Sequence, residues 1–324
     1  MRLLSFAHQG QSRIGSLFER NSVIDLNRAY AQYMLEEEKN PLGREIASIL
    51  FPSDMTTFLK GGERAFEATR MAIEFVEDQI SSRKGDASLR EAGILLNRDE
   101  LRLRAPVPRP GALLCAGKNF ADHVGEMSGR GAPRFPVAFP KMQHTIIGPE
   151  DDVPYPREVK NLDYEVELAV VIGKPCRDVG RDEAWGYIAG YTVFNDISAR
   201  DVVREENDLG VFLMGKNFPG FSPMGPYLVL REEIPDPQNL RLELRVNGEI
   251  RQKSDLSYMI FKIAEIISYW SQIGLKPGDI LTTGTPSGVA AGKKDGSWWL
   301  QPGDVVEAEV ESVGCLRNRI VPEE

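Results

Sequence analysis

The chain has 324 residues, of which 42% are hydrophobic and 27% charged, and its formal net charge at pH 7 is −9. This size predicts one large domain or a small domain followed by a larger one. The acidic balance argues against nucleic acid as a partner, and the lack of any run of about 18 apolar residues argues against a membrane span. The three cysteines have no metal-finger spacing, and the first residues lack a signal-peptide pattern, so we expect a cytoplasmic protein with reduced thiols.

The first hundred residues have the pattern of a small α/β unit. Short strands are expected at 2–7, 13–18 and 22–25, with turns at Gly10 and Asn21. From residue 26 to about 82 the apolar spacing becomes helical, with separate helices at 55–60 and 63–82. Nothing in this region has the pattern of a catalytic site.

Residues 105–111, APVPRPG, mark a domain boundary. Three prolines at alternate positions cannot donate ladder hydrogen bonds, and they favour an extended connector. We therefore predict a small amino-terminal domain over 1–104 and a β-rich domain over 105–324. In the second domain, Asn247-Gly248 predicts a hairpin turn and 305–310 an alternating strand. Its few expected helices lie near 181–185, 199–207 and 260–273.

Three carboxylates stand out in the second domain. Glu165 and Glu167 are one residue apart in an apolar run, 164–172, that is typical of a buried strand, so both side chains point to one face. A second strand-like run ends at Asp196. Like charges in a buried site repel, and a hard divalent cation such as Mg²⁺, Mn²⁺ or Ca²⁺ relieves this. The residues alone leave open an alternative, in which the two glutamates line the solvated face of an amphipathic strand.

A histidine and two loops are further candidates. His123 and Glu126 are three residues apart, a spacing that places both on one face of a helical turn, either as a general base with its carboxylate or as a surface pair. Lys216 ends an apolar run and either enters a pocket or extends to the surface. The turn 281–289, LTTGTPSGV, offers backbone N–H groups and hydroxyls to an anion, but it has neither a phosphate-loop nor a G-x-S-x-G pattern. The tetrapeptide GKNF occurs twice, at 117–120 and 215–218, and we interpret a four-residue repeat in 324 residues as coincidence.

The order of these motifs resembles the fumarylacetoacetate hydrolase family. The matching stretches are GKNFADHVGEM, LDYEVELAVVIGK, GYTVFNDISARD, GKNFPGFSPMGPYLV, VNGEIRQ and GDILTTGTPSGV, and they extend over residues 105 to 321. The resemblance implies an α+β, β-rich fold: a mixed β-sandwich roll with flanking helices, joined to the small α/β amino-terminal domain of longer members. It also implies a homodimer.

The resemblance assigns roles residue by residue. It implies that Glu165, Glu167 and Asp196 hold Mg²⁺ or Mn²⁺, and that His123 and Glu126 activate water on a segment that closes over the ligand. It also implies that Lys216 polarises a substrate carbonyl. The implied substrate contacts are Thr285, Gly284, Lys141 and Arg200. Two departures from the family pattern, Val203 in place of a glutamine and Met142-Gln143-His144 in place of Ser-Pro, leave the substrate open.

The implied activity is that of a metal-dependent enzyme acting on a small 2-oxo acid. Our main expectation is hydrolysis of a C–C bond in a 2,4-dioxo acid, such as an acylpyruvate or fumarylpyruvate in aromatic catabolism, through a metal-bound enolate. The alternatives are an oxaloacetate decarboxylase, and a tautomerase or 2-hydroxyhepta-2,4-dienedioate-type isomerase, on the same site. A weaker alternative is a non-catalytic scaffold stabilised by a metal ion.

Overall fold

The computed structural model describes residues 1–19, 21–127 and 131–323. Its largest element is a twelve-stranded mixed sheet with the order β4-β3-β2-β1-β14-β12-β11-β17-β6-β7, to which β5 and β8 are added at β1 and β14. The strands are β1 (Arg2–His8), β2 (Gln11–Phe18), β3 (Ser22–Asp25), β4 (Leu95–Asn97), β5 (Arg102–Arg104), β6 (Leu113–Ala116), β7 (Ala138–Pro140), β8 (Ile146–Ile147), β11 (Val166–Ile172), β12 (Ile188–Asn195), β14 (Ser222–Leu230) and β17 (Ile280–Thr282).

A second, five-stranded sheet packs against one face of the large one. Its order is β16-β15-β18-β19-β9, with bounds β9 (Val153–Tyr155), β15 (Arg241–Val246), β16 (Glu249–Asp255), β18 (Val305–Val310) and β19 (Gly314–Pro322). Leu168 and Val170 of β11 share one apolar core with Leu244 and Ala308 of this sheet. The two sheets therefore form the expected β-sandwich. A short pair, β10 (Leu162–Asp163) with β13 (Ser198–Ala199), lies beside it.

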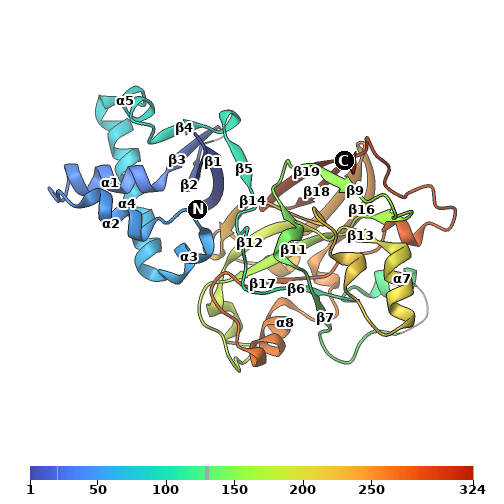
Figure 1. The fold of residues 1–324 in the computed structure, drawn as a ribbon. Coiled ribbons are helices and arrows are strands. Elements are labelled where there is room, and N and C mark those ends of the chain that lie inside the picture. Colours follow the sequence, from blue (N-terminus) through green and yellow to red (C-terminus); the bar gives the residue numbers. More distant parts are fainter. Residues whose placement is uncertain (20, 128–130, 324) are drawn as a thin grey trace.

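The opposite face of the large sheet is covered from the amino-terminal region. Ala169 and Val171 alternate along β11 with Leu168 and Val170. They share a second core with Leu26, Ala29 and Phe58. Both faces of β11 are thus buried, which explains its apolar run from Leu168 to Ile172. The amino-terminal helices, seen in blue at the left of Figure 1, are α1 (Leu26–Glu36), α2 (Gly43–Leu50), α3 (Met55–Lys60), α4 (Glu63–Gln79) and α5 (Ala87–Glu91).

Three helices flank the sandwich: α6 (Ala121–Glu126), α7 (Arg200–Asp208) and α8 (Ile263–Trp270). No helix of the described chain is long and apolar enough to cross a membrane. The expected fold class is confirmed, and so are the three first strands, the hairpin at Asn247-Gly248 and the strand 305–310. The helix expected at 181–185 is wrong: this segment is a turn that leads into a 3₁₀ turn, Ala184–Tyr187.

The domain boundary near residue 105 stays a prediction, and strands from both sides of it pair with each other. Strand β1 pairs antiparallel with β14, with Arg2 opposite Val229 and Leu3 opposite Leu228. The amino-terminal strands therefore extend the sheet of the larger region rather than forming a separate sheet (Figure 1).

Candidate active site

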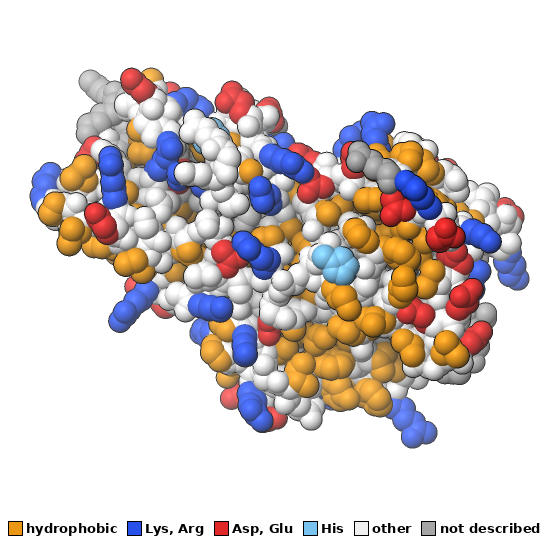
Figure 2. Space-filling model, viewed as in Figure 1, with side chains coloured by type: hydrophobic (Ala, Val, Ile, Leu, Met, Phe, Trp, Pro, Cys, Tyr) orange, Lys and Arg blue, Asp and Glu red, His pale blue; other side chains and the backbone are white. Residues whose placement is uncertain are grey.

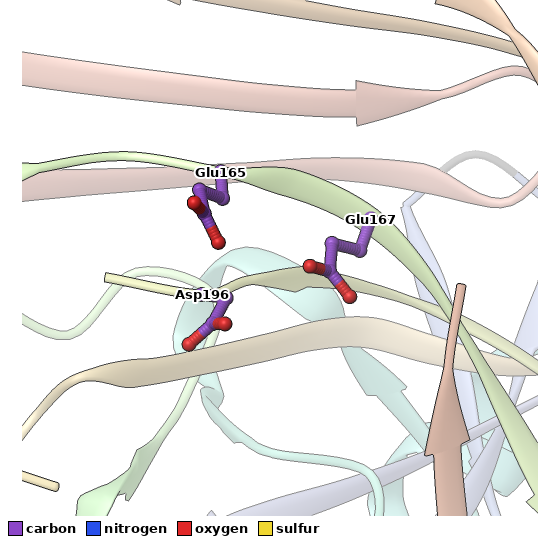
Figure 3. A group of neighbouring side chains, drawn as sticks. All are labelled: Glu165, Glu167 and Asp196. Atoms are coloured by element: carbon purple, nitrogen blue, oxygen red, sulfur yellow. The ribbon is translucent and has the colours of Figure 1, made fainter. Parts of the chain in front are cut away.

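Glu165, Glu167 and Asp196 converge where β11 and β12 lie side by side. Glu165 immediately precedes β11, Glu167 is its second residue, and Asp196 follows the last residue of β12 (Figure 3). One oxygen from each carboxylate lies within 4.8 Å of the other two. All three side chains are buried, with exposed fractions of 5%, 1% and 1%. The alternative of a solvated strand face is therefore wrong.

Two cations neutralise part of this cluster. The Lys216 ammonium donates to Glu165 Oε2 and to Asp196 Oδ2, each at 2.7 Å. The Arg200 guanidinium donates to Glu165 and, through Nε, to Asp163 Oδ2 at 2.7 Å. Lys216 is 1% exposed. Of the two interpretations left open for this lysine, the buried one holds.

Asp163 is a functional neighbour that the sequence did not reveal. Besides the Arg200 contact, its carboxylate accepts hydrogen bonds from the backbone N–H groups of Ala290 and Ala291, at 2.7 and 3.1 Å. It thereby fixes the Arg200 guanidinium and the loop after residue 289 in one place. No periodicity distinguishes an aspartate between two strands, at the end of β10, from an ordinary turn residue, so this role depends on the tertiary fold.

Lys141 contacts the carboxylate cluster on the side away from the cavity. Its ammonium donates to Asp196 Oδ1 at 2.5 Å and to the Phe221 carbonyl oxygen at 2.6 Å. The described residues that line the neighbouring cavity include neither Lys141 nor Asp196. This placement makes Lys141 a support for the Asp196 carboxylate, and the substrate contact implied for it receives no support.

The charges of the cluster fit a divalent cation. Burial raises the pKa of Glu167 well above its usual range, and the negative charges of Asp196 and Glu165 raise it further. Burial acts in the same direction on Glu165, but the charges of Arg200 and Lys216 outweigh it and lower the pKa of that carboxyl group. Among the described residues, Glu167 has no ion pair with lysine or arginine, and it accepts a hydrogen bond from the Gly284 N–H at 3.0 Å. A set of hard oxygen donors with one unneutralised carboxylate suits Mg²⁺, Mn²⁺ or Ca²⁺.

The cluster opens into a cavity of about 460 Å³. Its polar lining includes Glu165, Glu167, Arg200, Lys216 and His123. Its apolar wall is formed by Val124, Val137, Ala138, Phe139, Val203 and Phe212, among others. A cavity of this size, with a few convergent polar groups, is typical of a small-molecule site.

Helix α6 carries His123 into this cavity. The imidazole is 8% exposed, and its Nδ1 lies 3.6 Å from Glu126 Oε2, without a hydrogen-bond partner in the described chain. Both Glu126 oxygens accept from the Gly288 N–H, at 3.1 Å each. Asp122, one turn earlier, accepts from the Ser287 hydroxyl at 2.7 Å. Helix α6 is thus held by its own carboxylates against the turn 281–289.

The same turn supports Glu167 and the cavity wall. Thr285 lines the cavity, but its hydroxyl donates to the Val166 carbonyl oxygen at 3.0 Å and accepts from Gln252 Nε2 at 2.9 Å. Gln252 is fully buried and also accepts from the Val166 N–H. A glutamine at an inward position of a strand is the signal in the sequence that could have indicated this link, and it was not among the predicted site residues.

Glu126 has its place because residue 292 is a glycine. A Cβ atom built on Gly292 would lie 2.0 Å from Glu126 Oε1. We expect Gly292→Ala to displace Glu126 and, with it, His123, and to lower turnover about 10- to 100-fold, because small misplacements of catalytic groups cost that much. Steady-state kinetics check this. Gly186→Ala is the control, since its Cβ meets nothing within 4 Å. Unchanged turnover in Gly292→Ala would contradict the coupling of Glu126 to His123.

Comparison with known proteins gives the family. The family model described as "Fumarylacetoacetate (FAA) hydrolase C-terminal" matches residues 112–321. The chain is 40% identical over 271 residues to the mitochondrial oxaloacetate tautomerase Fahd2a of Rattus norvegicus, covering 83% of this chain and 80% of that protein. It therefore belongs to the fumarylacetoacetate hydrolase family.

Several solved structures match this chain over its whole length and over their own, among them two hydrolases. The fumarylacetoacetate hydrolase of Exiguobacterium antarcticum is 29% identical, with a TM-score of 0.74. The maleylpyruvate hydrolase of Sphingobium sp. SYK-6, solved with manganese(II) and pyruvate, is 25% identical, with a TM-score of 0.71. Together with the acidic cluster, this supports a divalent metal site. The rat relative is named as mitochondrial, so the expected cytoplasmic location stays a prediction for this chain.

Proposed function

We propose that this chain is a tautomerase that interconverts the enol and keto forms of oxaloacetate with the help of Mg²⁺ or Mn²⁺. The observation that carries the proposal is that His123, Glu165 and Glu167 line one cavity, and that Asp196 completes the carboxylate cluster beside it. A tautomerase needs a group that moves a proton beside a group that binds the 2-oxo acid, and this cavity offers both. The 40% identity to an oxaloacetate tautomerase favours this reaction over C–C hydrolysis, our main expectation from the sequence.

The proton transfer is assigned to His123. In the keto form C3 carries two hydrogens. The imidazole takes one of them as a proton, the C–H electron pair becomes the C2=C3 π bond, and the C2=O π pair moves onto the oxygen, which then receives a proton. The reverse sequence returns the keto form. No water is consumed and no C–C bond breaks, so the reaction needs one proton-carrying side chain, and Glu126 lies beside His123 at 3.6 Å.

Two further groups of the chain act on the oxygen atoms. A divalent cation held by Glu165, Glu167 and Asp196 would supply Lewis-acid polarisation of the substrate's carboxylate and carbonyl oxygens. The Lys216 ammonium uses two of its three N–H donors on Glu165 and Asp196, so the third is available for the C2 oxygen.

Hydrolysis of an acylpyruvate is the second candidate. The short distance between Glu126 and His123 favours it, because such a pair can activate water as well as move a proton from carbon. The likeness to a maleylpyruvate hydrolase points the same way. The two reactions differ in products, because only hydrolysis releases pyruvate and a second acid.

A stopped-flow assay tests the proposal. Enol-oxaloacetate is mixed with protein and Mg²⁺, and the loss of enol absorbance is followed against a blank that contains Mg²⁺ alone. We expect His123→Ala to lower the enzymatic rate by a factor of about 10² to 10⁴, the range of a lost general acid–base. His8→Ala is the matched control, because His8 ends β1 in the amino-terminal region.

Other outcomes discriminate the alternatives. Pyruvate release from acetylpyruvate, without enol conversion, would replace the proposal with hydrolysis. Carbon dioxide release from oxaloacetate would indicate a decarboxylase. Tight Mg²⁺ binding without any of these reactions would support the scaffold.

We also propose that the protein acts as a homodimer. Figure 2 shows hydrophobic side chains gathered on the part of this face that belongs to the larger region, whereas charged side chains are spread over the rest. A large exposed apolar area is typical of an interaction surface. Sedimentation equilibrium gives the mass that checks this.

A further inference from the structure

Both GKNF segments, at 117–120 and 215–218, bring a lysine to the same cavity. Lys118 follows β6, and Lys216 ends a 3₁₀ turn, Met214–Lys216. These residues are far apart in sequence, yet both line the cavity. The repetition therefore has a structural counterpart.

A buried asparagine fixes each lysine from the next position. The Asn119 side chain donates to the Thr283 carbonyl oxygen at 2.8 Å and accepts from the Phe261 N–H at 2.8 Å. The Asn217 side chain accepts from the Met142 N–H at 2.6 Å and donates to the Leu213 carbonyl oxygen at 2.8 Å. Each turn is thereby clamped to a separate part of the fold, so the position of each lysine is set by the scaffold.

The two lysines differ in their partners. Lys216 is buried and paired with two carboxylates. Lys118 is exposed, and it has neither an ion pair nor a side-chain hydrogen bond with any residue of the described chain. Its φ angle is +55°, in the left-handed region that favours glycine. A lysine is thus held, uncompensated and in a strained conformation, at the cavity's exposed rim.

We propose that Lys118 binds the carboxylate at the far end of a dicarboxylic 2-oxo acid and makes the cavity selective for dicarboxylates. The inference rests on the proposed function, in which the 2-oxo end lies at the cluster of Glu165, Glu167 and Asp196. The lining cations Arg200 and Lys216 are paired with Glu165, and the remaining donor of Lys216 is assigned to the C2 oxygen at the 2-oxo end. A second substrate carboxylate therefore needs another cation, and Lys118 supplies it.

The cavity wall supports this assignment. Val203 is the residue at which the sequence departs from the family's glutamine, and it lines the cavity with no polar atom to offer. The neighbouring lining residues Val124, Val137 and Phe139 are apolar too. Along this wall, Lys118 is therefore the main positive charge available to the far carboxylate of a substrate.

Calorimetric binding of lactate and malate to the Mg²⁺-loaded protein tests the inference. Malate is lactate with a carboxylate in place of one methyl hydrogen, so the ratio of the two dissociation constants isolates the far carboxylate. We expect malate to bind at least about tenfold more tightly than lactate, because one charge-assisted contact contributes about that gain in affinity. High salt should reduce the ratio, because the contact is exposed.

Lys118→Met is expected to remove this preference by weakening malate binding about tenfold while lactate binding stays within about twofold. Lys118→Arg should keep the preference. Lys60→Met is the control: Lys60 is an exposed lysine at the end of α3, so the same charge is removed away from the cavity. Unchanged malate binding in Lys118→Met, or an equal loss for lactate, would overturn the inference.

The result also separates this inference from the proposed function. A malate preference that depends on Lys118, without oxaloacetate turnover, would keep the ligand class and discard the tautomerase. Turnover without that preference would keep the tautomerase and discard the role of Lys118.

Discussion

Glu167→Gln is expected to abolish metal-dependent turnover, to below about one thousandth of the wild-type rate, because an amide replaces one of the three ionised carboxylates that would hold the cation. Loss of several kcal/mol of charge stabilisation corresponds to this factor. We expect Mg²⁺ affinity to fall at least about 100-fold, more than the loss of an outer-shell partner causes. Calorimetric titration of Mg²⁺ and the enol assay measure both effects. Wild-type Mg²⁺ affinity in this variant would remove Glu167 from the site.

The same substitution should raise the melting temperature of the metal-free protein above neutral pH. The pKa of Glu167 is raised in the folded state from an ordinary value of 4.5, so folding favours its protonated form. That stabilisation is fully present below pH 4.5 and is lost as pH rises through the folded-state pKa. The wild-type minus variant difference in melting temperature, measured in EDTA, should therefore become more negative with rising pH, and Mg²⁺ should reverse it. A difference independent of pH would contradict the raised pKa.

Lys216→Met is expected to lower the free energy of unfolding by about 3–5 kcal/mol, because removing one partner leaves buried carboxylates uncompensated. Glu165 and Asp196 each lose a 2.7 Å hydrogen bond, and both are almost fully buried. Urea unfolding measures the loss in metal-free protein. Added Mg²⁺ should recover part of it, since the cation supplies positive charge to the same carboxylates.

The other GKNF lysine provides the control for this prediction. Lys118→Met removes an exposed ammonium from the same cavity, so its free energy of unfolding should stay within about 0.5 kcal/mol of wild type. Equal losses in the two variants would show that overall charge, and not the buried pairing of Lys216, determines stability.

Local patterns predicted those parts of the molecule that depend on neighbours in sequence. The period of two places Glu165 and Glu167 on one side of β11, and Asp196 follows because β12 is the adjacent strand of the same sheet. The Asn-Gly hairpin and helix α3 are likewise local. The spacing of His123 and Glu126 predicted a shared helical face, and α6 provides it.

Contacts between distant segments lay beyond local patterns. Asp163 holds Arg200 and the backbone after residue 289, but its sequence context is that of an ordinary turn residue. Glu126 was assigned to His123 alone, whereas Gly288 binds both of its oxygens. Lys141 matched a basic family position, yet which side of Asp196 it occupies depends on how β7 and β14 enclose it.

The pairing of β1 with β14 sets an order for folding. Strand β1 leaves the ribosome long before its partner, Ser222–Leu230. Contacts between such distant segments form late and slow folding. Strand β5 pairs with Ser5–Ala7 on the same edge, so until β14 arrives only the start of β1, at Arg2 and Leu3, lacks its partner there. An unpaired strand edge invites mispairing or chaperone binding. Proteolysis of ribosome-bound chains should show full protection of the start of β1, at Arg2 and Leu3, appearing only after residue 230 has emerged.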